Sequence, residues 1–501
     1  MVFSSYEFIF IFLPIVLIIF YMLKKFNHIQ SAKLFLVLAS LFFYAFWKVE
    51  YVLILLLSMG VNFYLANLIL LNKGGGVKLL FYSGVFFNLA LLAFFKYTDF
   101  LLENFNVFFQ IVQLDFNIPL PHILLPLAIS FFTFQQIAFL VDCYKRTNIE
   151  SLKSENTYKI NILDYALFIT FFPQLIAGPI VHHKEMMPQF KSMLWNNSIL
   201  INWENIAKGL FIFSMGLFKK VYIADSFALW ANAGFKIVEN GGTLNIFEAW
   251  ATSLSYTFQL YFDFSGYCDM AIGIALFFSI KLPINFNSPY KALNISDFWR
   301  RWHITLGKFL KDYLYIPLGG NRVSKIINLR NLFIVAFVSG VWHGAGWGFV
   351  IWGVLHGLAM VLHRIYSFIT PNAKFKESII YKIFAWFVTF NFINLAWIFF
   401  RSENLQGAIN LLKAMFGITW MELPIKWHRM KESLAQISGS NETLIYIIVC
   451  MILCIGFKNS IEKLEKFKAS YINSLLVMLF LYIALITLGV VPYTEFIYFN
   501  F

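Results

Sequence analysis

Two histidines lie inside one of the most hydrophobic stretches of the sequence. His343 stands in the run Val-Ser-Gly-Val-Trp-His-Gly-Ala-Gly-Trp-Gly-Phe, and His356 follows a few turns later. Hydrocarbon penalises titratable groups, so a histidine kept there is a candidate for function. The alternative is a core histidine held by hydrogen bonds, but the flanking glycines and tryptophans favour chemistry. We therefore predict that His343 is catalytic and that Trp342 and His356 contact substrate.

A second group of candidates lies in residues 294–315. The apolar positions recur at helical spacing: Phe298, Trp302, Leu306, Phe309 and Tyr313. This spacing predicts an amphipathic helix at the membrane surface, capped by Asn294 or Ser296, with His303 at the edge of its apolar face. The basic face could bind lipid headgroups, or it could bind an anionic substrate with His303 directed inward. The candidate substrate contacts from this segment and the turn after it are Trp299, Arg300, Arg301, Lys311, Asn321 and Arg322.

Two carboxylates and a broken span complete the set. Asp263 and Asp269 lie in an apolar run, where they either bridge helices or contact substrate. Pro173 and the pair Gly178-Pro179 interrupt another span, as a kink or as an interrupted helix beside a cavity. We interpret His182-His183 as part of a solvated loop, and we predict no metal site.

The composition indicates which element type positions these residues. Of the 501 residues, 60% are hydrophobic and 13% are charged, against about 25% charged in soluble domains. The bilayer must therefore be the solvent, and the continuous apolar runs favour helices over strands. We predict an all-α polytopic membrane protein, a single domain over residues 1–501, with about 11–13 membrane helices including broken or re-entrant ones. The net charge of +13 then reflects cytoplasmic loops rather than nucleic-acid binding.

The distribution of Lys and Arg predicts the topology. Basic connections, such as those around Lys73 and around Lys153 and Lys159, alternate with neutral or acidic ones, which places both termini outside the cytoplasm. Residues 331–363 lie between two basic segments and are too short for two crossings of ~20 residues each. We therefore predict a re-entrant hairpin that breaks at Gly340 and at Gly344–Gly348, with His343 near the middle of the bilayer.

Four segments together resemble the membrane-bound O-acyltransferase (MBOAT) superfamily, most closely the bacterial branch that holds the alginate and peptidoglycan O-acetyltransferase membrane subunits. The segments are Pro173–Pro179, Tyr261–Gly273, Asp297–Arg322 and Ser339–Gly357. The resemblance implies a helical bundle with a central tunnel. It also implies that His343 is the catalytic histidine of the Trp-His-Gly motif and that His303 is the second histidine of the family.

The resemblance also implies a function. We expect an enzyme of the bacterial inner membrane that passes acetyl groups from cytoplasmic acetyl-CoA outward, for O-acetylation of peptidoglycan or an alginate-like glycan. Acetyl-CoA would be the donor, with no permanently bound cofactor, and a periplasmic SGNH-type protein would be the partner. Alternatives are D-alanyl or other acyl transfer by the same fold, or transport of an anionic solute, although the paired repeats of transporters are not evident.

The last residues of the chain are rich in aromatic side chains. Composition alone favours an interfacial membrane anchor for this ending. It also resembles the tyrosine-bearing C-terminal motif of the small partner peptide of the D-alanylation system. By that resemblance Tyr498 would carry the acyl group transiently or would dock a partner.

Overall fold

The computed structural model describes residues 1–72, 74–147, 160–195, 200–370, 374–419, 433–490 and 495–500. Every regular element in these ranges is helical, so the all-α fold class is confirmed. Lys73, Lys153 and Lys159, on which the topology prediction draws, lie outside the described residues. The chain divides into two compact units: residues 1–213, 270–283 and 498–501 form the first, and residues 214–269 and 284–497 form the second.

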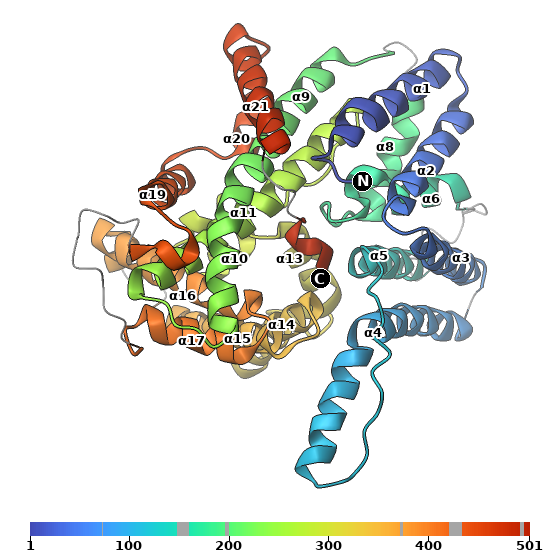
Figure 1. Ribbon diagram of the computed structural model, residues 1–501. Helices are drawn as coiled ribbons and strands as arrows, with labels where there is room; N and C mark the ends of the chain where they lie inside the picture. Colours follow the sequence, from blue (N-terminus) through green and yellow to red (C-terminus); the bar gives the residue numbers. More distant parts are fainter. Residues whose placement is uncertain are drawn as a thin grey trace. The chain divides into compact units, whose positions relative to one another are not determined.

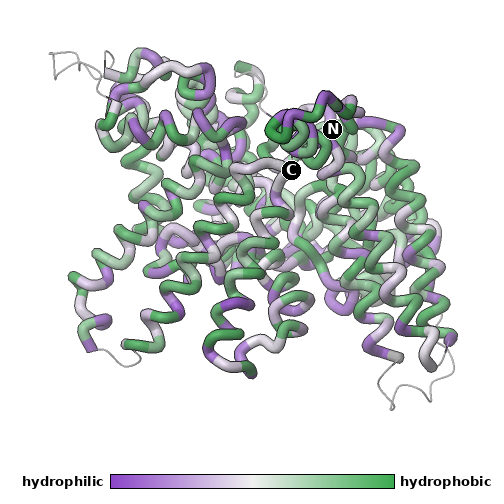
Figure 2. Tube along the Cα trace, turned by 90° about the horizontal axis from the view of Figure 1, so that it is seen from below, coloured by the Kyte–Doolittle hydropathy of each residue, from purple (hydrophilic) through white to green (hydrophobic). Residues whose placement is uncertain are grey.

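Eight helices of the described ranges are long and apolar enough to cross a membrane, which confirms a polytopic membrane protein. They are Glu7–Lys25 (η1 with α1), α3 Val49–Leu71, α4 Gly76–Ile111, α11 Ile246–Phe277, α14 Lys325–His343, α15 Trp347–Ile369, α16 Ile379–Arg401 and α21 Tyr471–Val490. Two further apolar helices are shorter: α2 Ile29–Ala45 and α19 Asn441–Gly456. Figure 2 shows how hydrophobic residues follow these helices along most of their length. Such surfaces face lipid without cost.

The first unit is built from the N-terminal helices (Figure 1). Besides α1 Leu13–Lys25, α2, α3 and α4, it contains α5 Ile129–Thr147, α6 Ile162–Thr170, α7 Phe172–Leu175, α8 His183–Trp195 and most of α9 Trp203–Phe218. Its core is aromatic, with Phe8, Phe43 and Phe172 in mutual ring contact. A buried ion pair joins Lys33 on α2 to Asp164 on α6. Lone charges are not tolerated at such positions, so this pair fixes how the two helices pack.

The span over residues 162–182 is broken, as the prolines predict. Helix α6 ends at Thr170, the single turn α7 ends at Leu175, and residues 176–182 are irregular. The prediction that His182 and His183 are solvated is wrong, because both are buried. The His183 ring packs 5.0 Å from the ring of Phe139 and 5.5 Å from that of Phe168. Burial against these rings removes the pair from water.

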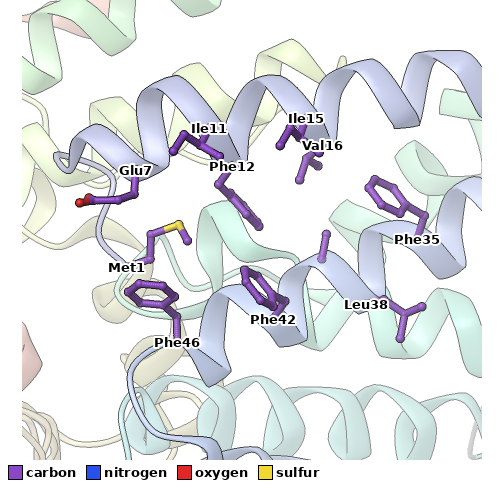
Figure 3. A pocket seen from close by; sticks show the side chains of 11 residues that line it. Met1, Glu7, Ile11, Phe12, Ile15, Val16, Phe35, Leu38, Phe42 and Phe46 are labelled. Atoms are coloured by element: carbon purple, nitrogen blue, oxygen red, sulfur yellow. The ribbon is translucent and has the colours of Figure 1, made fainter.

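A cavity of about 500 Å³ opens between α2 and the helix formed by η1 and α1. Figure 3 shows its lining, in which the rings of Phe12 and Phe42 face each other between the two helices and the carboxylate of Glu7 points away from them. A lining of this kind suits hydrocarbon and offers no arrangement of groups for chemistry on a polar substrate.

The second unit contains the helices that carry the histidines. They are α12 Ile295–Arg301, α13 Ile304–Leu310, α14, α15 and α16, joined by most of α11 and by α10 Asp225–Glu239, α17 Leu405–Met415, α19, α20 Ser460–Glu465 and α21. Short helical turns connect them: the π-turns η3 Lys219–Ala224 and η5 Lys311–Tyr315, and the 3₁₀ turns η4 Pro289–Lys291, η6 Lys374–Glu377 and η7 Ala435–Ile437. Helix α11 is buried throughout its most apolar stretch, although it carries the carboxylates Asp263 and Asp269.

Helices α14 and α15 pack against each other as a hairpin, and the chain turns between them at Gly344–Gly346. The predicted break at Gly344–Gly348 is confirmed for residues 344–346, whereas Gly348 lies inside α15. A Cβ on Gly344 would lie 2.1 Å from Cε2 of Phe349, so a larger residue there would displace this ring. The predicted break at Gly340 is wrong. Gly340 lies inside α14, where a Cβ would stand 2.6 Å from Cα of Gly353, so this glycine allows the two helices to approach closely.

The prediction that the segment is too short for two crossings is also wrong. Helix α14 begins at Lys325 and α15 ends at Ile369, which gives helices of 19 and 23 residues. Arg330 lies within α14 and Arg364 lies within α15, although the positive charge of each predicts the end of a span. Long basic side chains reach the interface from inside a helix, so charge alone does not end a span. His343 is the last residue of α14, at the turn between the two helices.

Candidate active site

The segment from residue 294 to residue 315 is two short helices and a π-turn. Asn294 caps α12, its side-chain oxygen accepting from the backbone N–H of Asp297 at 2.8 Å, as the sequence predicts. The prediction of one continuous amphipathic helix is wrong, because the helix breaks at His303, whose φ is +45°. A left-handed conformation is uncommon for a residue other than glycine and is frequent at functional sites.

Asn285 explains this break. Its backbone oxygen accepts from the N–H of Ile304 at 3.0 Å. Its side-chain oxygen accepts from the N–H of Thr305 at 3.2 Å and from the Thr305 hydroxyl at 2.9 Å. These bonds take the place of those that a continuous helix would make one turn back. The sequence analysis missed Asn285, and the only signal was an asparagine between apolar residues of an extended segment.

The same asparagine holds His303. The side-chain oxygen of Asn285 lies 3.1 Å from Nδ1 of His303. Because this oxygen acts as an acceptor toward Thr305, we assign the ring proton to Nδ1 and the lone pair to Nε2. The ring is fully buried, and burial, helped by the nearby His343, holds the pKa of His303 well below its ordinary value of 6.5. His303 is therefore neutral at pH 7.

His343 is fixed in a similar way from its own helix. Its Nδ1 lies 2.6 Å from the backbone oxygen of Ser339. A carbonyl oxygen can only accept, so Nδ1 donates, and in the neutral ring the lone pair is on Nε2. The rings of Trp352 and Phe400 lie 5.1 and 5.2 Å from the His343 ring. The side chain is 2% exposed, so a small apolar enclosure orients it.

The structure brings the predicted histidines together. The ring centroids of His303 and His343 are 6.5 Å apart. His356 is linked to them through Trp352, whose ring is 4.5 Å from that of His356 and 5.1 Å from that of His343. Trp299 on α12 donates its indole N–H to Nδ1 of His356 at 3.2 Å. Trp342 also belongs to this cluster, with its ring 6.2 Å from that of His303.

A cavity of about 540 Å³ lies beside the cluster, between α12, α13, η5, α14 and α15. Its cations are Arg300, Lys308 and Lys311, all of them exposed, and its apolar wall includes Leu306, Leu310, Leu332, Val335, Ala336 and Met360. Trp299 lines it, and so does Ser339, the residue that orients His343. The cavity therefore combines a cationic region with an apolar wall that reaches the helical turn carrying His343.

Three other predicted contacts lie outside this lining. Arg301 is bound to Asp297, with Nε 3.0 Å from Oδ2. Asn321 is exposed and accepts from the hydroxyl of Tyr315 at 3.0 Å. Arg322 is exposed in the turn that follows two glycines with positive φ, as the sequence predicts for a turn. The substrate-binding role of these three residues stays a prediction.

The two carboxylates of α11 are engaged in buried ion pairs. Oδ1 of Asp263 lies 3.0 Å from Nζ of Lys220, which also lies 2.7 Å from Asp225. Oδ2 of Asp269 lies 2.7 Å from Nζ of Lys219. Both lysines belong to η3, so the carboxylates bridge α11 to this turn, and their contact with substrate stays a prediction. The sequence analysis missed Lys219 and Lys220, although adjacent lysines in an apolar run are the signal for such pairs.

Asp263 also holds the residues just before Tyr498. Its Oδ2 accepts from the backbone N–H of Ile497 at 2.9 Å. The ring of Phe496 stacks on that of Tyr267, with centroids 4.5 Å apart and planes inclined by 25°. Tyr498 itself is 3% exposed. Phe496 and Ile497 are therefore held against α11, while the role of Tyr498 as acyl carrier or docking residue stays a prediction.

The fold and the site define a polytopic helical membrane protein with a buried histidine pair beside a cationic cavity. Residues 111–404 match the membrane-bound O-acyltransferase (MBOAT) family. The chain belongs to this family and is an acyltransferase.

Three relatives illustrate the match. The chain is 48% identical to a peptidoglycan O-acetyltransferase of Helicobacter pylori over an alignment that covers 100% of this chain and 98% of the relative. It is 38% identical to a probable alginate O-acetylase of Pseudomonas aeruginosa, covering 84% of this chain and 76% of the relative. It is 34% identical to a probable alginate O-acetylase of Pseudomonas syringae, over an alignment that covers 93% of this chain and 84% of the relative.

Proposed function

We propose that this protein is a membrane O-acetyltransferase that takes acetyl groups from cytoplasmic acetyl-CoA and passes them outward for O-acetylation of a cell-envelope polysaccharide. The observation that carries the proposal is the position of His343, buried and held by Ser339 next to a cationic cavity that Ser339 itself lines. The names of the relatives, which acetylate peptidoglycan or alginate, support the acetyl group and the polysaccharide class.

The cavity supports a donor that is anionic at one end and apolar at the other. Arg300, Lys308 and Lys311 would bind the phosphates of acetyl-CoA, and the apolar wall would hold the pantetheine arm. The thioester would then lie toward Ser339 and His343. Trp299 lines the cavity and bonds His356, so it would couple donor binding to the aromatic cluster around His343.

The chemistry follows from the assigned tautomers. Nε2 of His343 takes the proton of the acceptor hydroxyl as that oxygen attacks the thioester carbonyl carbon. The tetrahedral intermediate then collapses, the carbon–sulfur bond breaks, and the departing thiolate recovers the proton from Nε2. A thiol with a pKa near ~8.5 needs little acid assistance to leave. His303 is a second neutral acceptor beside His343. Because the attacking hydroxyl has a single proton, we propose that Nε2 of His303 accepts its hydrogen bond before the attack and that Nε2 of His343 receives the proton during it.

The enclosure of the site favours transfer over hydrolysis. His303 and His343 are both buried among aromatic rings, and a dry site limits attack of water on the thioester. A periplasmic SGNH-type protein would complete the transfer to the glycan, because the proposed chemistry of this chain ends on the outer side of the membrane. The inner membrane of a bacterium is the corresponding location, with both termini on the periplasmic side.

We propose Tyr498 as the first acyl acceptor. The docking of Phe496 and Ile497 on Tyr267 and Asp263 supports this role, because it fixes the backbone immediately before the tyrosine. A phenol with a pKa near ~10 is a poor nucleophile at pH 7 and would need a base such as His343. Tyr498→Phe should abolish glycan acetylation if the hydroxyl carries acetyl. If Tyr498 only docks a partner, Tyr498→Phe should stay active and deletion of residues 496–501 should not.

The function can be tested with the purified chain in sealed proteoliposomes. Acetyl-CoA with a labelled acetyl group is added on one side, and acetyl transfer to protein or to added glycan fragments is measured on the other. The proposal predicts that the acetyl label crosses while the CoA part of the donor stays on the side where it was added. Entry of intact anion without transfer would support the transporter alternative, and transfer from D-alanyl thioester but not from acetyl-CoA would support the other acyl branch.

A further inference from the structure

A second cavity, of about 360 Å³, lies between the start of α12, the second half of α15 and the first half of α16. Most of its wall is apolar, and the residues that form this wall are Leu293, Ile295, Ala359, Phe384, Val388 and Phe392. Phe384 and Val388 are 63% and 49% exposed. The cavity is therefore an apolar slot in a surface that a bilayer would cover.

One part of the slot is polar. His363, Tyr366 and Tyr381 line it. Nδ1 of His363 lies 3.0 Å from the hydroxyl oxygen of Ser296, and the hydroxyl of Tyr366 donates to that of Tyr381 at 3.2 Å. All three side chains are only partly buried. This part can therefore offer hydroxyl and ring nitrogen groups to a ligand that enters from the surface.

The charges around this polar part are positive. Those that act on His363 come from Arg364, Lys376 and Arg300. Nζ of Lys376 lies 4.6 Å from the centroid of the Tyr366 ring, which itself lines the slot. The nearby carboxylate of Asp297 does not cancel this charge, because it is shared between Arg300 at 3.8 Å and Arg301 at 3.0 Å.

An apolar slot whose polar part carries cations matches an amphiphile with an anionic head. We propose that this cavity binds an anionic phospholipid, with one acyl chain along Phe384 and Phe392 and the phosphate beside Arg364 and Lys376. Basic pockets between membrane helices at a membrane face are suited to such headgroups. The site is separate from the cavity assigned to the donor, and it needs no part of the proposed acetyl transfer.

The two cavities are nonetheless joined by one hydrogen bond. Ser296 lines the donor cavity, and its hydroxyl is the partner of His363, which lines the lipid slot. Ser296 lies in the first turn of α12, the helix that carries Trp299 and Arg300, and His363 contacts it from α15. Lipid in the slot would therefore hold the helix that forms one wall of the donor cavity.

The proposal can be tested with the purified full chain in a neutral detergent. Native mass spectrometry would count bound lipid during titration with dioleoylphosphatidylglycerol or dioleoylphosphatidylcholine. The wild type should retain the anionic lipid at lower concentration than the zwitterionic one. The variant Arg364→Gln/Lys376→Gln should lose roughly 30-fold in affinity for the anionic lipid, from about 1 kcal/mol for each cation.

The matched control is Lys374→Gln/Lys382→Gln, which removes the same charge from exposed positions of the same region. It should change affinity less than about twofold, and an equal loss in both double variants would overturn the site in favour of diffuse attraction. Ala359→Leu keeps every cation and fills the slot, so it should also lose the bound lipid even if the charge variant fails to fold. Equal retention of both lipids by the wild type, or displacement by millimolar glycerol 3-phosphate, would overturn the proposal.

Discussion

Removing the side chain of Asn285 should damage both the fold and the reaction. In Asn285→Ala, three donors lose their acceptor: Nδ1 of His303, and the backbone N–H and hydroxyl of Thr305. The hydroxyl can turn to another partner, while the ring N–H and the backbone N–H stay buried. At about 1–3 kcal/mol for each unsatisfied donor, the variant should lose about 2–6 kcal/mol of folding free energy.

The catalytic consequence separates positioning from simple loss of fold. Without Asn285 the His303 ring loses the bond that sets its tautomer and orientation, whereas the lining of the donor cavity is unchanged. We expect kcat for acetyl transfer in proteoliposomes to fall by roughly tenfold or more, a part of the ~10²–10⁴ assigned to a positioned proton acceptor. The KM for acetyl-CoA should stay within about twofold.

Asn285→Asp supplies a second readout. A carboxylate beside His303 would raise the pKa of this histidine from its depressed value, since an opposite charge favours the imidazolium. The pH at which activity is half-maximal should therefore move upward in this variant. Asn72→Ala is the control, because it removes an exposed asparagine whose side chain donates one hydrogen bond to the backbone oxygen of Leu68. Wild-type kcat and stability in Asn285→Ala would refute this account of the break at His303.

Three further predictions concern buried charge, the donor cavity and pH. Lys220→Met leaves Asp263 buried without its cation, which should cost ~3–5 kcal/mol and lower the yield of monodisperse protein; normal yield and melting behaviour would contradict the paired arrangement. Lys311→Glu should raise the KM for acetyl-CoA by roughly tenfold, from about 1.4 kcal/mol of lost attraction, while Lys382→Glu, at an exposed position outside the cavity lining, should leave KM nearly unchanged; equal effects would argue against the assigned donor site. The pKa of His303 lies below 6.5 in the folded chain, so the unfolded chain binds more protons than the folded chain below that pH. The free energy of unfolding should therefore fall as the pH drops from about 6.5, by up to ~1.4 kcal/mol per pH unit. His303→Gln should remove this part of the slope, and an unchanged slope would contradict the burial of the neutral ring.

Sequence alone could predict the class of fold and the residues of the site that stand in hydrophobic runs. Continuous apolar segments that cross a bilayer must form helices, and the structure has helices at these segments. His343 is a candidate because a titratable group in such a run needs a reason, and His303 is one because it lies at the edge of the apolar face of the expected helix. The end of α14 at Gly344 is also predictable, since a run of glycines is unfavourable inside a helix.

The remaining features depend on contacts between distant parts of the chain. The break at His303 needs Asn285, which lies in a separate extended segment, so local periodicity favours a continuous helix. The role of Asp263 depends on Lys220 and on Ile497, and neither is near it in sequence. Sequence alone underestimates the lengths of α14 and α15, because a charged residue predicts the end of a span although its long side chain can reach water from within the helix.

The most direct test of the central claim is single-turnover acetyl transfer by His343→Ala in proteoliposomes, with the wild type and His28→Ala, a change at an exposed histidine, measured in parallel. The account predicts that His343→Ala folds, still binds acetyl-CoA and loses ~10²–10⁴-fold in rate, while His28→Ala retains the wild-type rate. A rate for His343→Ala within about threefold of the wild type would contradict the assignment of His343 as the base.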